Sequence, residues 1–317
     1  MADSRKKVRI PTPPHPYKRR EPLPWHRPKP AEDDPDAQER IDRILKSPSY
    51  RQADEDVDFL NQNDTRGVRL QVDYLKAEVM LERHHIRHTI VVFGGTRIQE
   101  PAAVRRQINA LHKAQASDPL NKELGRRIEI AERLRAKSRY YKIAREFGRL
   151  VGSDTQHDLV IMTGGGPGIM EAANRGAFDA GAKSIGLNIH LSHEQYPNPY
   201  ITPDLCFRFH YFALRKLHFL LRARALVAFP GGFGTLDELF ETLTLVQSRT
   251  IMPVPVVLVG ENYWRQVFNV DFLVDEGVID PEDRELFWFA ETAQKIWDGI
   301  RHWHKVNDAS LKRTSSD

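Results

Sequence analysis

The sequence is short of several features that would define common protein classes. It holds a single cysteine, Cys206, which excludes an intramolecular disulfide and any metal cluster built on cysteines. No apolar run approaches the ~20 residues needed to cross a bilayer, and no hydrophobic signal segment follows Met1. With 317 residues, of which 40% are apolar, the chain is able to bury a sizeable core. We therefore expect a soluble, cytoplasmic protein.

Two common nucleotide-binding motifs are also absent. A dinucleotide-binding site needs G-x-G-x-x-G after its first strand, but Thr96 and Arg97 follow the first glycine pair. Counted from Gly164, the third glycine position of that motif is Ile169. Neither of the later glycine-rich segments supplies the lysine of a P-loop. The sequence thus argues against a standard NAD site and against tight binding of a nucleoside triphosphate with magnesium.

The positive charge of the chain is unevenly distributed. The net charge is +4 and the pI is about 9.1, but residues 1–30 hold nine basic and two acidic residues. The rest of the chain is therefore slightly acidic, and the basic stretch is rich in proline. We interpret residues 1–66 as a largely disordered extension, basic and then acidic, which leaves a binding role of the basic tail open. A nucleic-acid partner is not expected.

Strand-like apolar runs alternate with helical segments from residue 88 to residue 303. Their continuous apolarity is typical of strands that are covered on both faces. We predict a doubly wound, parallel α/β sheet in one domain at residues 67–306, followed by a tail at 307–317. Residues 101–150 are expected to form a crossover helix with an extra helix inserted. The predicted strands span residues 88–95, 157–165, 183–189, 225–232 and 254–260.

Three of these strands end in glycines, and ligands of such sheets bind at the carboxyl ends of the strands. The glycines alone are also compatible with tight strand-to-helix turns. Three such loops together, two of which open helices, favour the binding of an anion the size of a monophosphate. The residues concerned are Gly94, Gly95 and Thr96; Gly164, Gly165 and Gly166; and Gly231, Gly232, Gly234 and Thr235.

Acidic and basic residues near the last of these loops allow two interpretations. Thr235 and Glu238 fit a capping box, in which Glu238 only closes the start of a helix. Alternatively, Glu238 and Glu241, one helical turn apart, face a sugar beyond the phosphate. Arg215 and Lys216 lie in a largely apolar helix, where a charge is costly unless it is paired or reaches solvent. Pairing of Arg215 with the carboxylates or with substrate favours the second interpretation.

The same segments carry a family resemblance. PGGFGTLDE, residues 230–238, fits the signature P-G-G-x-G-T-x-x-E, and ALRK, residues 213–216, fits its upstream Arg-Lys motif. Together with TGGGPGIMEAANRGA (163–177) and SIGLNIHLSHEQYPNPYIT (184–202), they make the chain resemble the LONELY GUY family in its bacterial branch with longer chains. This family of nucleoside 5′-monophosphate phosphoribohydrolases was long mislabelled as lysine decarboxylases. The resemblance covers about residues 67–303.

The resemblance implies a Rossmann-like fold, a homodimer or assembly of dimers, and no metal or organic cofactor. The implied reaction is hydrolysis of the base–ribose bond of AMP, or of an N6-modified, cytokinin-type AMP, to free base and ribose 5-phosphate. Arg215 and Glu238 become the catalytic pair, and residues 231–235 hold the phosphate. Further substrate contacts are carried over to Glu171, Asn188, Glu194, Lys216, Glu241 and Thr244.

Two other functions are weighed against this one. A carrier of a nucleotide or of molybdenum cofactor could use the same fold without hydrolysis, but it does not need Arg215 and Glu238 as a pair. A lysine decarboxylase that uses pyridoxal phosphate needs a lysine for the Schiff base and a partner for the pyridine nitrogen. No such arrangement stands out in the sequence. We therefore predict an N-glycosidase.

Overall fold

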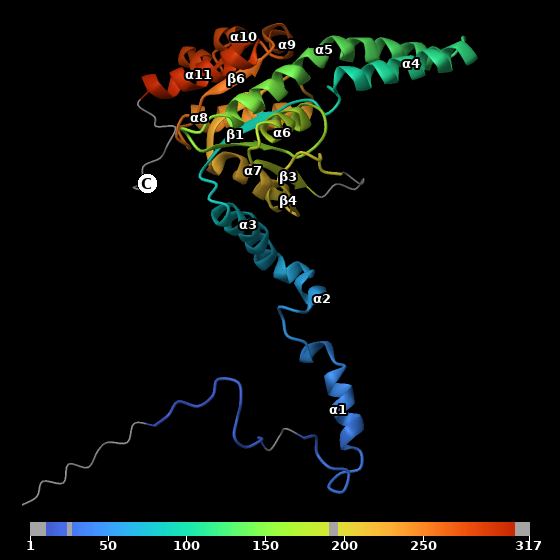
Figure 1. The fold of residues 1–317 in the computed structure, drawn as a ribbon, viewed down its shortest axis with the longest axis vertical. Coiled ribbons are helices and arrows are strands. Elements are labelled where there is room, and N and C mark those ends of the chain that lie inside the picture. The colour runs from blue at the N-terminus through green and yellow to red at the C-terminus, as the bar shows by residue number, and fades with distance from the viewer. Residues whose placement is uncertain (1–10, 24–26, 190–195, 308–317) are drawn as a thin grey trace, which may run out of the picture. The chain divides into compact units, whose positions relative to one another are not determined.

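The computed structural model describes residues 11–23, 27–189 and 196–307 (Figure 1). The chain divides into two compact units, Met1–Arg69 and Leu70–Asp317. The first unit holds α1 (Ala37–Leu45), α2 (Val57–Leu60) and the start of α3 (Arg66–Arg83). Helices α1 and α2 lie in the segment expected to be largely disordered, and that disorder stays a prediction. Among the helices of the described residues, none is both long and apolar enough to span a membrane.

The second unit is built on a seven-stranded sheet in the order β4-β3-β2-β1-β5-β6-β7, and all of its pairings are parallel. The predicted α/β sheet is thus confirmed. The five predicted strands are present, whereas the two edge strands β4 and β7 were not predicted from the sequence. The strands are β1 (His88–Phe93), β2 (Leu159–Thr163), β3 (Ser184–Ile189), β4 (Cys206–Phe209), β5 (Ala223–Ala228), β6 (Val256–Val259) and β7 (Phe287–Ala290).

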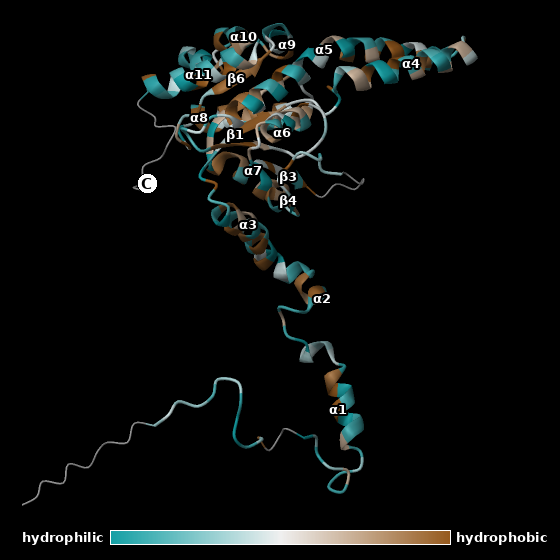
Figure 2. Cartoon of the chain, in the orientation of Figure 1, coloured by the Kyte–Doolittle hydropathy of each residue, from teal (hydrophilic) through white to brown (hydrophobic). Residues whose placement is uncertain are grey.

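Helices cover both faces of this sheet. Successive side chains of a strand point to opposite faces, so Ile90 and Val92 of β1 pack against one helical layer and Val91 and Phe93 against the other. Figure 2 shows the central strands as the hydrophobic layer. The first layer is formed by α5 (Lys122–Gly152), α6 (Ile169–Asp179) and α11 (Ala293–Val306). The second is formed by α3, α7 (Phe212–Leu221), α8 (Phe233–Gln247), α9 (Glu261–Val267) and α10 (Val270–Asp275).

Helix α5 is longer than a crossover requires. Its second half packs on the sheet through Tyr141, Phe147 and Val151. Its first half pairs instead with α4 (Pro101–Ser117) around a separate small core that includes Val104 and Ile108. The expected crossover helix with an inserted helix is therefore confirmed, and Figure 1 shows the α4–α5 hairpin extending beyond the strands.

The order of the strands fixes where a ligand can bind. The chain runs outward from β1 through β2, β3 and β4 and then returns to place β5 on the other side of β1. The loops that leave β1 and β5 therefore turn to opposite faces of the sheet, and a crevice opens between them at the carboxyl ends of the strands.

Candidate active site

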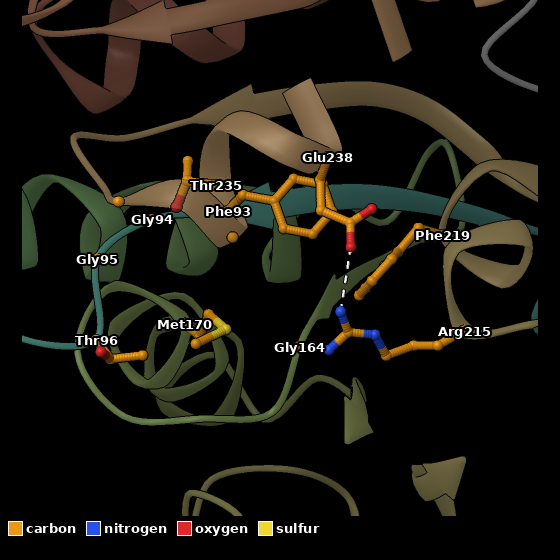
Figure 3. A pocket seen from close by; sticks show the side chains of 12 residues that line it. Phe93, Gly94, Gly95, Thr96, Gly164, Met170, Arg215, Phe219, Thr235 and Glu238 are labelled. Atoms are coloured by element: carbon orange, nitrogen blue, oxygen red, sulfur yellow. Dashed lines mark hydrogen bonds and ion pairs between the residues drawn. The ribbon is translucent and has the colours of Figure 1, made fainter. Parts of the chain in front are cut away.

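A pocket opens at this point of reversal, at the carboxyl ends of β1, β2 and β5 (Figure 3). The loops that follow the three strands form one part of its wall, and helices α6, α7 and α8 form the rest. The lining residues are Phe93, Gly94, Gly95, Thr96, Gly164, Met170, Arg215, Phe219, Gly232, Gly234, Thr235 and Glu238.

The three loops are bonded to one another. The N–H of Gly95 donates to the carbonyl of Pro230 at 2.9 Å, and the N–H of Ile169 donates to the carbonyl of Gly95 at 3.3 Å. Gly168 has a φ of +74°, and a Cβ at this position would lie 2.5 Å from the carbonyl oxygen of Gly95. Only glycine fits there. The loop after β1 is therefore held by contacts with both of the other loops.

Helix α8 begins at the pocket. Its N-cap is Gly232, no side chain caps it, and its first residue is Phe233. The capping-box interpretation of Thr235 and Glu238 is therefore wrong, because the helix starts two residues before Thr235. The first N–H groups of a helix have no acceptor within it, and this end of the helix dipole is positive. Since Gly232 and Gly234 line the pocket, this helix end is suited to an anion.

Tyr263 of α9 orients the loop that leads into α8. Its hydroxyl donates to the carbonyl of Gly231 at 2.5 Å. In a trans peptide the C=O and the following N–H point in opposite directions. The bond from Tyr263 therefore fixes the orientation of the peptide between Gly231 and Gly232, with the N–H of Gly232 pointing away from Tyr263. Sequence reasoning missed this residue, which lies in the next helix along the chain and belongs to no glycine motif.

Arg215 of α7 and Glu238 of α8 form a buried ion pair beside the glycine loops. Their Nη2 and Oε1 atoms are 3.2 Å apart, and their side chains are only 14% and 5% exposed. The guanidinium also lies over the ring of Phe212, 4.4 Å from its centroid. Figure 3 shows the carboxylate and the guanidinium facing each other across one end of the pocket. The Nε of Arg215 is buried and has no hydrogen-bond partner in the described part of the chain.

Burial dominates the electrostatics of this pair. Removal from water raises the pKa of Glu238 to about 7, although Arg215 and Lys216 both act to lower it. Burial likewise lowers the pKa of Arg215, against the attraction of Glu238 and Asp237. The carboxyl group of Glu238 can therefore take up and release a proton near neutral pH, which is the property expected of an acid–base catalyst.

Lys216 connects α7 to α8 on the other side of Arg215. Its Nζ lies 3.0 Å from an oxygen of Asp237 and 2.8 Å from one of Glu241. Burial acts to lower the pKa of Lys216, but the hydrogen bonds to Glu241 and Asp237 outweigh it and raise this pKa. Lys216 thus neutralises the carboxylates of Asp237 and Glu241, and Arg215 pairs with Glu238.

The structure brings nine of the predicted site residues together around the pocket. They are Gly94, Gly95, Thr96, Gly164, Arg215, Gly232, Gly234, Thr235 and Glu238. Eight others lie outside its lining: Gly165, Gly166, Glu171, Asn188, Lys216, Gly231, Glu241 and Thr244. Glu194 lies outside the described residues.

Three of the residues outside the lining have other partners. Glu171 accepts a hydrogen bond of 2.7 Å from the hydroxyl of Tyr141. Asn188 packs against Gly165, and its side-chain oxygen is buried without a partner among the described residues. The hydroxyl of Thr244 donates to a carbonyl of its own helix. Their assignment to substrate stays a prediction.

Three apolar residues of the lining were missed by sequence reasoning: Phe93, Met170 and Phe219. Phe93 lies within the predicted strand 88–95, and the other two lie on helices. Their apolar side chains resemble those of any core position, so only the fold shows that they face the pocket. Apolar and aromatic walls with a few polar groups are typical of pockets for small molecules.

Comparison with known proteins identifies related sequences. A family model described as "Possible lysine decarboxylase" matches residues 170–300. A "Probable cytokinin riboside 5′-monophosphate phosphoribohydrolase" of Oryza sativa subsp. japonica is 28% identical over 161 residues, which is 47% of this chain and 71% of the relative. A cytokinin riboside 5′-monophosphate phosphoribohydrolase of Arabidopsis thaliana is 26% identical over 163 residues, 49% of this chain and 68% of the relative.

A solved structure with lower similarity is the molybdenum cofactor binding protein from the phototrophic bacterium Rippkaea orientalis. It is 23% identical, covers 52% of this chain and 87% of its own, and superposes with a TM-score of 0.37.

Proposed function

Because the chain belongs to the LONELY GUY family, we propose that it hydrolyses the N-glycosidic bond of a nucleoside 5′-monophosphate. The proposed substrates are AMP or an N6-modified, cytokinin-type AMP, and the products are the free base and ribose 5-phosphate. The two plant relatives carry names for this reaction on cytokinin riboside 5′-monophosphates.

The phosphate of the substrate binds at the N-terminal end of α8 in this proposal. Gly232 and Gly234 present backbone there, and Gly94 and Gly95 face them from the loop after β1. Free N–H groups and the positive end of the helix dipole stabilise the doubly charged phosphate. The ribose then extends along α8 toward Glu238, because this residue lies about one helical turn further from the start of the helix.

Cleavage of the base–ribose bond leaves positive charge on C1′ and the ring oxygen of the ribose. The ionised carboxylate of Glu238 stabilises this oxocarbenium-like state and accepts a proton from the water that attacks C1′. The bonding electrons leave with the base, whose nitrogen takes up a proton. With a pKa of about 7, Glu238 can release its proton again after each turnover.

Arg215 keeps this buried carboxylate in place and ionised. A carboxylate that is only 5% exposed is costly to keep charged without a nearby cation, and the guanidinium is 3.2 Å away. Arg215 also lines the pocket, and we assign its guanidinium to the ribose hydroxyls. Phe93, Phe219 and Met170 supply apolar surface on which the base rests.

The buried Arg215–Glu238 pair at the wall of the pocket is the observation that carries this proposal. A carrier protein would need the glycine loops but would gain nothing from a buried ion pair, which contributes little net stability. The experiment that tests it incubates the full-length protein with a panel of nucleoside 5′-monophosphates, and free base is detected by chromatography. Release of base at a rate no higher than without protein, for every member of the panel, would reject the enzyme.

We also propose that the protein forms a homodimer through the outer face of α8. Phe233 is 91% exposed, and Phe240 on the same helix is 38% exposed. With Leu236 and Glu241 these residues line a shallow surface groove. Exposed apolar surface of this kind is typical of protein–protein contacts. Light scattering on the purified protein is expected to give twice the chain mass of 36.6 kDa, and Phe240→Glu is expected to shift it toward the monomer.

A further inference from the structure

The α4–α5 hairpin is a separate structural feature that the proposed function does not use. Helix α4 packs against α5, and their contacts surround Val104, Ile108, Leu111 and Ala131. None of the pocket residues comes from the hairpin. The hairpin extends beyond the strands (Figure 1), so its outer surfaces are open to solvent.

The hairpin is strongly basic, in contrast to the rest of its domain. Residues 101–139 contain ten lysines and arginines and four acidic residues, a net charge of +6. Since the whole chain carries +4 and residues 1–30 carry +7, the residues outside both segments carry −9. Of these nine negative charges, six belong to residues 31–66 and three to the rest of the domain, so positive charge within the domain is concentrated on this protruding element. Clustering of basic residues on one element is typical of surfaces that bind polyanions.

Four of these basic residues form one stripe along α5. Lys122, Arg126, Arg133 and Lys137 follow the spacing i, i+4, i+11 and i+15, which places them within about 60° of one another around the helix. The stripe is about 22 Å long at 1.5 Å per residue. Apart from Lys137, which is half-buried, these residues are exposed, and Glu129 lies at the edge of the stripe.

The charge of the stripe is mostly unpaired. Within the described residues, Arg126 lies 3.8 Å from Glu123, both of them exposed, and no ion pair is found for Lys122, Arg133 or Lys137. Exposed pairs of this kind contribute little to stability. Salt bridges within the protein therefore do not account for the basic residues of the stripe.

The composition of the hairpin favours one kind of partner. Residues 101–139 contain no phenylalanine, tyrosine or tryptophan, the aromatic residues that anchor many protein–protein contacts and stack on unpaired bases. The apolar face of the first half of α5 is occupied by α4, so it is not free to enter a lipid bilayer. What remains is a row of cations suited to phosphate groups. The stripe is also longer than the ~12 Å width of the major groove.

In contrast to the expectation from the sequence, which considered only the N-terminal tail, we propose that the α4–α5 hairpin binds the phosphate backbone of double-stranded nucleic acid, without sequence preference. Arginine suits this role because its planar guanidinium binds a phosphate through two parallel hydrogen bonds. This inference does not depend on the reaction proposed for the pocket.

The test measures binding of the full-length protein to a fluorescent duplex of about two helical turns, by anisotropy, over a series of salt concentrations. One arm uses duplex DNA and the other duplex RNA. In the test variant Lys122, Arg126, Arg133 and Lys137 are changed to alanine, which is favourable in a helix. In the matched control, four basic residues of the N-terminal tail are changed instead: Lys18, Arg19, Arg20 and Arg27.

Loss of four phosphate contacts is expected to lower the slope of log K against log salt by about 3.6. Between about 50 and about 200 mM salt, the affinity of the unchanged protein should therefore fall roughly 100-fold more than that of the hairpin variant. The tail variant should retain the slope contributed by the hairpin. Thermal melting verifies that both variants are folded.

Three results would overturn the proposal. The first is an unchanged salt slope in the folded hairpin variant, and the second is loss of binding in the tail variant alone. The third is binding of anionic lipid vesicles or single strands without binding of either duplex.

Discussion

Replacement of Glu238 by glutamine tests the proposed chemistry most directly. Glutamine keeps the size of the side chain and one oxygen for the guanidinium of Arg215, but it removes the charge. The side chain is buried, and its Oε1 is 3.2 Å from Nη2 of Arg215. Glu241, one turn further along α8, provides a matched control. It pairs with Lys216 and does not line the pocket.

The stability of the variant follows from the pKa of Glu238. Burial raises this pKa from 4.5 to about 7, so the folded state binds the proton more tightly than the unfolded state. The stability that the protonated group contributes is complete below about pH 4.5 and is lost as the pH rises to about 7. The loss amounts to about 3 kcal/mol. Glutamine removes this cost but leaves the buried guanidinium of Arg215 without its counter-ion, so we expect the two effects to offset and the melting temperature of Glu238→Gln to change little at pH 7.

The rate of catalysis, unlike the stability, should fall strongly in Glu238→Gln. Loss of acid–base assistance costs roughly 10²–10⁴-fold in rate, so turnover of AMP by Glu238→Gln is expected to fall at least about 100-fold while AMP still binds. In the unchanged protein, kcat/KM should fall about tenfold for each pH unit below about 7, because only the ionised carboxylate acts on the substrate.

The assay follows release of free base from AMP by chromatography, together with thermal melting of each variant and calorimetric binding of AMP. Glu241→Gln should keep most of the activity, because Glu241 does not line the pocket; a large loss would instead support the substrate contact predicted for it from the sequence. The mechanism is refuted if Glu238→Gln hydrolyses AMP within a few-fold of the unchanged protein. A kcat/KM that stays constant down to about pH 5 would remove Glu238 as the titrating group.

Three further predictions use the same assay. Arg215→Ala should lose activity to a similar extent as Glu238→Gln. The double variant should be little worse than either, since the effects of residues that act as a unit are not additive. Additive losses would argue for independent roles. Adenosine should be a far poorer substrate than AMP because it lacks the charge that binds at the start of α8, and equal turnover would refute the assignment of the glycine loops. Tyr263→Phe should raise the KM for AMP several-fold with a smaller change in kcat, because only the orientation of the Gly232 amide is lost; an unchanged KM would exclude the positioning role.

Much of the fold could be predicted because it depends on patterns local to the sequence. Continuous apolar runs mark strands buried on both faces, and β1, β2, β3, β5 and β6 all lie in such runs. The edge strand β4 has the residues CFRF with an exposed Arg208, so its pattern is too short and too mixed to stand out. Strand β7 is equally short. Their place is fixed by pairing with neighbours that are distant in the sequence.

The site could be predicted to the extent that motifs carry it. Arg215 and Glu238 are 23 positions apart, and their motifs indicated a pair that the structure brings within 3.2 Å. The capping-box interpretation of Thr235 and Glu238 was wrong, because α8 begins at Phe233 with Gly232 as its N-cap. Tyr263 and the apolar wall were missed, since their contribution depends on direction in space and leaves no pattern in the sequence.

The glycines around the pocket divide into two groups by the space beside them. A methyl group on Gly168 or Gly231 would collide with the backbone or with a side chain, so these glycines are required for the chain to close its loops. A methyl group on Gly232 or Gly234 would meet no atom of the described residues within 4 Å. The fold would accept alanine at both positions. The open space beside these two glycines is therefore not needed for packing and is available to a ligand. Substitution of Gly232 or Gly234 would change which ligands fit the pocket without disturbing the fold. Related proteins could therefore change their ligand preference at these two positions and keep the same architecture.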